Sequence, residues 1–209
     1  MENKGLLFIP DISGFTEFVT NIELAHSHHI IQELIEVLID ANEIGLEVSE
    51  IEGDAVLFYK FGKSPELSLI YEQVEKMFFA FHKHLKIYEQ HRTCHCNACT
   101  SAVDLTLKFI THYGEFIGYK VKNFYSLVGK DVIVAHQLLK NTIDKHEYWL
   151  VTKSLSNDNL PGDFRKWMKW NESNKQIGGN EVSFLYTQLS PLKAGALAEK
   201  GDSGLTVIK

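Results

Sequence analysis

The stretch from Leu7 to Thr16 constrains the fold most, because it joins a short apolar run, one carboxylate and a glycine turn. The apolar run predicts a strand that reaches Asp11, and Gly14 permits a sharp bend after it. Residues 21–40 then carry apolar side chains at helical spacing. Such a segment can hold a metal-bound phosphate, because the acid can ligate Mg²⁺ and the N–H groups at a helix start face phosphate oxygens. The alternative is a turn whose aspartate only caps the helix.

A second acid follows in a predicted hairpin over residues 47–61, where Glu52-Gly53-Asp54 forms the bend. If the two strands are neighbours, Asp54 lies beside Asp11. The rest of the chain predicts further elements that would complete one α/β layer structure. They are a helix over 65–90, a half-buried strand over 101–116, a loop and short helix over 123–140, a strand at 149–151, and strands over 164–170 and 182–189 around a polar turn at 171–180.

The composition is that of one soluble domain. The chain has 209 residues, a hydrophobic fraction of 44% and a formal net charge of −6. This acidic balance argues against a nucleic acid or an anionic membrane surface as the main partner. No apolar run approaches the ~20 residues of a membrane span, so we expect a cytoplasmic protein. We expect a single domain over residues 1–190 and a flexible tail over 191–209.

Three cysteines lie within six positions, at Cys94, Cys96 and Cys99. Soft thiolate ligands on one loop, with His91 or His95 as a fourth ligand, would make a closed Cys₃His zinc site. The alternative is three reduced thiols in a loop, and the spacing alone does not decide between the two.

With both acids in view, the chain resembles the catalytic domain of class III nucleotidyl (adenylate/guanylate) cyclases, as a divergent branch. Three blocks of residues carry the resemblance in the family's order: Phe8, Asp11, Ile12, Gly14, Phe15 and Thr16; Gly53-Asp54-Ala55-Val56; and His112, Gly114, Tyr125, Gly129, Val134 and Ala135. The implied fold is a ferredoxin-like α/β (α+β) sandwich, a mostly antiparallel sheet with helices on one face.

The resemblance also implies a site. Asp11, Asp54 and the Ile12 carbonyl would hold divalent ions, Mg²⁺ or Mn²⁺, in the two-metal arrangement of the family. Backbone N–H groups of Ser13, Gly14, Phe15 and Thr16 would cradle the phosphates of a purine nucleoside triphosphate. The family builds each site between two subunits, so a homodimer is implied.

Base selection in the family depends on the residue three positions before the hairpin glycine, which here is Glu50. Ser126 stands at the position of its pairing partner. A carboxylate can accept from guanine N1 and N2, and a hydroxyl can donate to O6, so GTP is favoured.

The chain departs from the family on the helix after Gly129. The positions that align with an Asn and an Arg, which position the ribose and stabilise the transition state in the family, are Ile133 and Gln137. A triphosphate-binding Lys aligns with Gly178, and Lys175 is the only local substitute for it. Each such group contributes about 10²–10³ in rate. We therefore expect a sensor or regulatory domain that binds metal and nucleotide with weak or absent cyclase activity.

Two alternatives stay open. The first is a working guanylate or adenylate cyclase that makes a 3′,5′-cyclic nucleotide, with Lys130, Lys140 or Asn141 replacing the missing groups. The second is an interaction domain in which Asp11 and Asp54 no longer bind metal.

Overall fold

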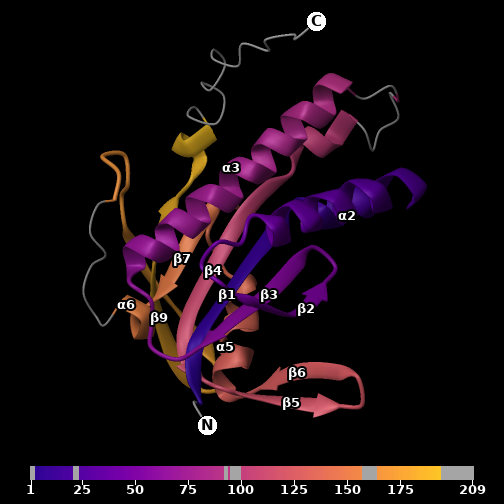
Figure 1. The fold of residues 1–209 in the computed structure, drawn as a ribbon. Coiled ribbons are helices and arrows are strands. Elements are labelled where there is room, and N and C mark those ends of the chain that lie inside the picture. The colour runs from indigo at the N-terminus through magenta and orange to yellow at the C-terminus, as the bar shows by residue number, and fades with distance from the viewer. Residues whose placement is uncertain (1–2, 21–23, 92–93, 95–99, 157–163, 194–209) are drawn as a thin grey trace, which may run out of the picture.

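A seven-stranded sheet forms the centre of the molecule (Figure 1). The structure is a computed structural model and describes residues 3–20, 24–91, 94, 100–156 and 164–193. The strands are β1 (Lys4–Ser13), β2 (Glu47–Glu52), β3 (Ala55–Phe61), β4 (Thr106–Glu115), β7 (Tyr148–Thr152), β8 (Asn171–Ile177) and β9 (Asn180–Gln188). Their order is β2-β3-β1-β4-β7-β9-β8, and only the β4–β7 pair is parallel. The expected mostly antiparallel α+β fold is confirmed.

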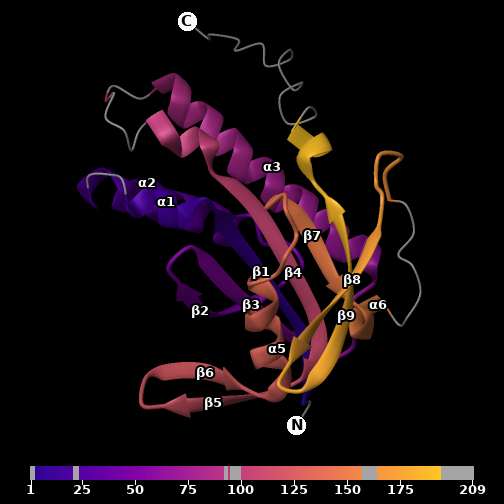
Figure 2. The ribbon, with the colours of Figure 1, turned by 180° about the vertical axis from the view of Figure 1, so that it is seen from behind.

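Helices cover both faces of this sheet, whereas the sequence led us to expect them on one face. The helices are α1 (Phe15–Thr20), α2 (Leu24–Asp40), α3 (Leu67–His91), α5 (Lys130–Leu139) and α6 (Lys153–Ser156). Figure 1 shows α2 and α3 in front of the sheet, and Figure 2 shows α5 in front of the opposite face. In the described part of the chain, no helix is both long and apolar enough to cross a membrane.

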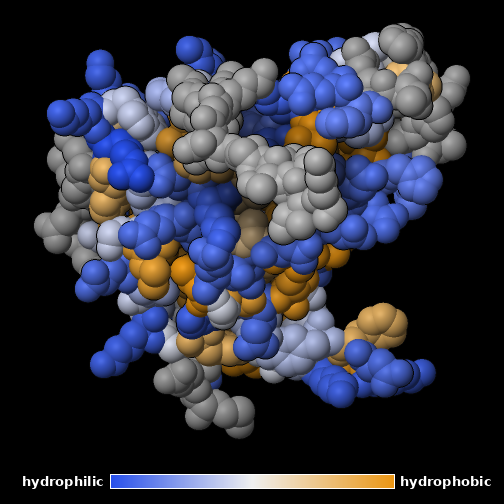
Figure 3. All heavy atoms as spheres, turned by 45° about the horizontal axis from the view of Figure 1, so that its top comes forward, coloured by the Kyte–Doolittle hydropathy of each residue, from blue (hydrophilic) through white to orange (hydrophobic). Residues whose placement is uncertain are grey.

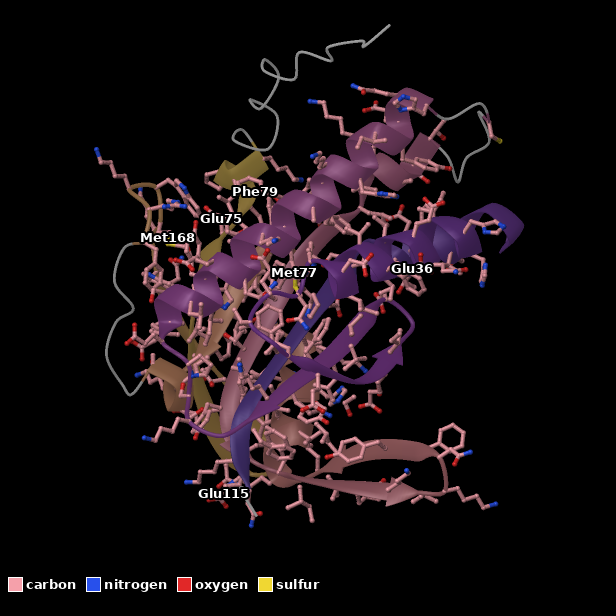
Figure 4. All side chains as sticks on the ribbon, viewed as in Figure 1. Glu36, Glu75, Met77, Phe79, Glu115 and Met168 are labelled. Atoms are coloured by element: carbon pink, nitrogen blue, oxygen red, sulfur yellow. The ribbon has the colours of Figure 1, made fainter. Side chains whose placement is uncertain are left out.

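The two faces have separate apolar cores, because alternate residues of each strand point to opposite sides. On the α2/α3 side, Phe8 and Phe58 pack with helix residues such as Met77, which points from α3 toward the sheet (Figure 4). On the other side, Leu7 and Leu57 pack with the α5 residues Val132, Val134, Ala135 and Leu138. Because both faces are covered, the central strand β1 is buried from Gly5 to Ser13. The amphipathic α5 is thereby fixed above the strands that carry the two acids.

A two-stranded hairpin precedes α5, where the sequence predicted a loop. Its strands are β5 (Ile117–Val121) and β6 (Phe124–Val128), which pair with each other. The hairpin stands away from the body of the molecule (Figure 3), and the Phe124 side chain near its turn is 77% exposed. Tyr125 of β6 connects the hairpin to the central sheet, because its ring stacks on Tyr59 of β3 with centroids 6.0 Å apart.

The C-terminal half differs from the prediction in one strand. Residues 164–170 form turns rather than a strand. The segment 171–180, predicted as a polar turn, consists of strand β8, a turn at 178–179 and the first residue of β9. Residues 190–193 form a helical turn, in which Leu192 is buried and Lys193 lies 2.6 Å from a Glu147 carboxylate oxygen. Packing therefore continues to residue 193, and residues 194–209 of the expected tail lie outside the described residues.

Candidate functional site

Asp11 and Asp54 line one cleft of about 590 Å³ between α5 and the end of the sheet where β1 finishes and β3 begins. Asp11 is opposite Ala55 in the antiparallel β1–β3 pair, so the hairpin turn that carries Asp54 lies beside it. The Ile12 N–H donates to the Asp54 carbonyl at 3.0 Å, which holds this turn against β1. Gly53 has a φ of 62°, a conformation that glycine adopts without strain and that the tight turn requires. The structure thus brings the two predicted acids together.

A lysine that the sequence analysis did not single out also enters this cleft. Lys108 of β4 is opposite Asp11 in the register, and its Nζ lies 3.1 Å from Asp11 Oδ1. Burial raises the pKa of Asp11, and the attraction of Lys108 offsets only part of that increase. Burial, together with the neighbouring Asp11, raises the pKa of Asp54 to about 6. Two negatively charged carboxylates are therefore unfavourable in this cleft unless a positive charge lies beside them.

The turn after β1 completes the wall of the cleft. The cleft is lined by five consecutive residues of this turn, which are Ile12, Ser13, Gly14, Phe15 and Thr16. Gly14 has a φ of 92°, which allows α1 to begin at the next residue. The Ser13 side chain is buried, and its Oγ has no hydrogen-bond partner within the described part of the chain. A buried hydroxyl without a partner is costly, so it indicates a place where a bound group would supply the missing contact.

These residues fit a divalent cation. Carboxylate and hydroxyl oxygens are the hard donors that Mg²⁺ and Mn²⁺ take, and Asp11 and Asp54 are two such donors with a mutual repulsion that a cation would relieve. Ile12 lines the same cleft and could add its carbonyl.

Replacing Asp54 by Asn should change how stability depends on pH. The folded pKa of about 6 lies above the usual 3.8, so between pH 4 and pH 6 the folded chain keeps a proton that the unfolded chain has released. This carboxyl thus lowers stability as pH rises through that window. We expect D54N to gain on the order of 1 kcal/mol relative to the parent between pH 4 and pH 7, since the group is partly exposed. Urea titrations at four pH values measure this gain. A difference in the free energy of unfolding between D54N and the parent that is the same at all four pH values would contradict it.

Ile133 and Gln137, the α5 residues that the resemblance aligns with an Asn and an Arg, both line a cleft on the other side of α5. A second cleft of about 790 Å³ is lined by Ile133, Gln137 and Gly178, and Gln137 also borders the first cleft. Ile133 is 61% exposed, so a large apolar side chain stands where the resemblance implies a polar one. The two clefts thus lie on either side of α5 and share Gln137.

A buried histidine fixes α5 in this position. His112 Nε2 lies 3.0 Å from Asp131 Oδ1 in the first turn of α5, and Asp131 Oδ2 accepts from the Glu115 N–H at 2.7 Å. Burial alone would raise the pKa of Asp131, but the bonds from His112 and Glu115 outweigh it and hold that pKa below its usual value. A Cβ on Gly114 would come within 2.3 Å of the Asp131 side chain, which explains the glycine of the His-x-Gly motif.

The two residues predicted to select the base lie on different strands. Glu50 is on β2, and its Oε1 lies 3.4 Å from His136 Nε2 of α5, while Glu52 Oε2 lies 3.4 Å from His136 Nδ1. Ser126 is on β6, opposite Tyr119 of the projecting hairpin. Glu50, Glu52 and His136 present ligand atoms within 4.8 Å of one another, a cluster that the sequence analysis did not identify.

Two of the residues proposed as replacements hold α5 and its surroundings instead. Lys175 Nζ donates to the Gln137 carbonyl at 2.6 Å and also to the Lys140 carbonyl, so its ammonium caps the C-terminus of α5. Asn141 donates to the Leu138 carbonyl at 2.8 Å and to the Tyr148 hydroxyl at 2.6 Å. Lys140 lines the first cleft, which we call the acidic cleft because it holds Asp11 and Asp54. Lys130 lines the second cleft.

The predicted zinc ligands are described only in part. Cys94 is half-buried, and His91 Nδ1 lies 2.9 Å from the Ile87 carbonyl at the end of α3. Cys96, Cys99 and His95 lie outside the described residues, so the zinc site stays a prediction.

Solved structures with the same fold are nucleotidyl cyclase domains. The guanylyl cyclase Cya2 has a TM-score of 0.59 at 13% identity, over 88% of this chain and 91% of its own. The catalytic core of a rhodopsin-guanylyl cyclase with converted specificity, in complex with ATPαS, has a TM-score of 0.60 at 15% identity, over 90% and 96%. A bacterial light-regulated adenylyl cyclase has a TM-score of 0.60 at 16% identity, over 89% and 52%. The protein therefore has the fold of a class III cyclase catalytic domain.

The sequence comparison gives the particular family. The model of the family described as "Protein of unknown function (DUF2652)" matches residues 31–148, more than half of the chain, and the chain belongs to this family. The protein named "Uncharacterized protein Rv2561/Rv2562" of Mycobacterium tuberculosis is 32% identical over 120 residues. That match covers 57% of this chain and 56% of the relative, so the chain spans a little over half of the curated relative's length.

Proposed function

We propose that this protein is a divergent nucleotidyl-cyclase-like domain that binds a divalent metal ion, Mg²⁺ or Mn²⁺, and a purine nucleoside triphosphate, and that it cyclises the nucleotide weakly or not at all. The observation that carries the proposal is the acidic cleft, where Asp11, Asp54 and the unpartnered Ser13 hydroxyl meet beside the Gly14 turn. When bound, the metal would neutralise the phosphates. In this account the domain acts in the cytoplasm as a sensor or regulatory module.

Poor cyclisation follows from the second cleft. Cyclisation requires the ribose 3′-oxygen to attack the α-phosphorus while the bond to pyrophosphate breaks, and charge develops on the phosphoryl oxygens. Ile133 offers no hydrogen bond there, and Gln137 carries no charge. Lys175, the nearest cation in sequence to the missing triphosphate lysine, is engaged with carbonyls at the end of α5.

The alternative of a working cyclase has one supporting observation, the Lys140 side chain in the acidic cleft. Incubation with GTP and with ATP in the presence of Mn²⁺, with products read by mass spectrometry, distinguishes the two. We expect at most one turnover in minutes to a day, and turnover near the ordinary ~10 s⁻¹ would replace our proposal with the enzyme.

We further propose that the protein pairs as a homodimer through the β5–β6 hairpin. This hairpin carries several exposed large hydrophobic side chains, which include Ile117, Tyr119, Val121, Phe124 and Val128. Ile133 on α5 is exposed as well. Two-fold pairing would join the acidic cleft of one chain to the second cleft of its partner.

Replacing Glu50 by Gln should remove the preference for guanine. A carboxylate accepts from both guanine donors, whereas an amide offers one acceptor and adds a donor, so GTP binding should weaken about tenfold relative to ATP binding. Competition of GTP and ATP for the parent and for E50Q measures the ratio. Glu36→Gln, on the surface helix α2, is the matched control, and a parent that prefers ATP would contradict the assignment of Glu50.

A further inference from the structure

Lys108 sits among the groups that would hold the metal. It is cross-strand from Asp11 on the central pair β1–β4, so both side chains lie on the same face of the sheet. The Lys108 and Asp11 side chains are only 12% and 11% exposed, and their charged atoms are 3.1 Å apart. Water and salt screen such a pair poorly, and neither partner can leave without burying the other unpaired.

The charge balance of the cleft differs from that of a site for two metal ions. Two carboxylates alone would offer two negative charges, and Lys108 already neutralises one of them. The cleft is also lined by two further acids, Glu17 and Glu52, and by the basic residues His146 and Lys140. The Glu52 carboxylate faces His136. A second divalent ion beside Asp11 would meet the Lys108 ammonium at close range, where like charges repel strongly.

We propose that the cleft binds one divalent cation instead of two, because the Lys108 ammonium takes the place of the second. This inference rests on the proposed function. Asp54 and Asp11 would hold the single cation, while Lys108 remains paired with Asp11 and supplies a fixed positive charge beside the nucleotide phosphates. The site would thus present two positive centres to the phosphates, as a two-ion site does, but only one of them would be an exchangeable ion.

Equilibrium dialysis with Mn²⁺ and 3′-deoxy-GTP tests the proposal, because this nucleotide lacks the hydroxyl that cyclisation consumes. The excess of Mn²⁺ and of nucleotide in the protein chamber gives the ratio of bound ions to bound nucleotide. We expect one Mn²⁺ per nucleotide for the parent. Lys108→Met should raise the ratio to two and tighten Mn²⁺ binding without nucleotide at least tenfold, whereas Lys108→Arg should keep the ratio at one.

Lys4→Met is the matched control. Lys4 also pairs with an acid across β1–β4, Glu115, but this pair is exposed and lies at the opposite end of the strands. Glu115 is labelled in Figure 4. Its loss should leave the ratio at one. A ratio of two for the parent would overturn the one-cation inference and leave the proposed function intact, whereas no Mn²⁺ binding would overturn both. The parent ratio decides the question even if K108M does not fold, which circular dichroism would reveal.

Discussion

Replacing Asp54 by Asn should lower the affinity of the cleft for Mn²⁺ by about 100-fold or more without loss of stability. A divalent ion a few ångströms from a carboxylate loses several kcal/mol of attraction when that charge is removed, even with substantial screening. Asp54 is at a hairpin turn, and both its burial and the neighbouring Asp11 make its negatively charged form unfavourable. The fold should therefore tolerate the neutral amide.

The same change at Asp11 should have a different outcome. Asp11→Asn would also weaken Mn²⁺ binding. Although burial raises the pKa of Asp11 as it raises that of Asp54, the amide leaves the buried Lys108 ammonium without its charged partner, so this variant should lose stability where D54N does not. Calorimetric Mn²⁺ titrations and urea unfolding of both variants measure the two effects. Glu115→Gln, an acid at the far end of β4, is the control and should change neither. Unchanged heats of Mn²⁺ binding in D54N would show that the site is assigned to the wrong residues.

Restoring the two missing groups should raise cyclic-nucleotide output by about 100-fold or more. The double variant Ile133→Asn with Gln137→Arg adds a ribose-positioning amide and a charge for the transition state, each worth about 10²–10³ in rate when the rest of the site is intact. Ile133 is largely exposed, and Gln137 borders both clefts, so neither substitution disrupts the buried face of α5.

The control for this gain is Ile133→Asn with Gln137→Met, which keeps the bulk of the second side chain without its charge. Light scattering must accompany the assay, because the restored groups reach the acidic cleft of a partner only in a dimer. A dimer whose output does not change on restoration would contradict the view that these two positions limit the reaction, and a strict monomer would remove the shared site.

Much of the fold could be predicted because its buried elements carry strong periodic patterns. The apolar stripe of α3 and the apolar run of β1 both follow from burial on one or two faces. Strand β8 was missed because it is an edge strand with mostly exposed side chains, so Asn171–Gln176 is as polar as a turn. The segment 164–170 was predicted as a strand because Phe164, Trp167 and Trp170 are apolar, yet they pack on the core from turns.

The site could be predicted in part. Asp11 and Asp54 follow from a strand–turn and a hairpin whose residues match a known pattern, but their closeness depends on the pairing of β1 with β3. Lys108 was missed although it carried a signal, since a lysine between the buried Leu107 and Phe109 of a central strand needs a partner. The Glu50–His136 contact could not be foreseen, because it depends on where α5 packs.

The measurement that tests the central claim most directly is a calorimetric titration of the parent protein with GTP, in Mn²⁺ and again in EDTA. We predict saturable binding in Mn²⁺ that disappears in EDTA and is much weakened in D54N, because the phosphates reach the acidic cleft only through a cation held by Asp11 and Asp54. Absence of GTP and ATP binding in Mn²⁺, or equally strong binding in EDTA, would contradict the account.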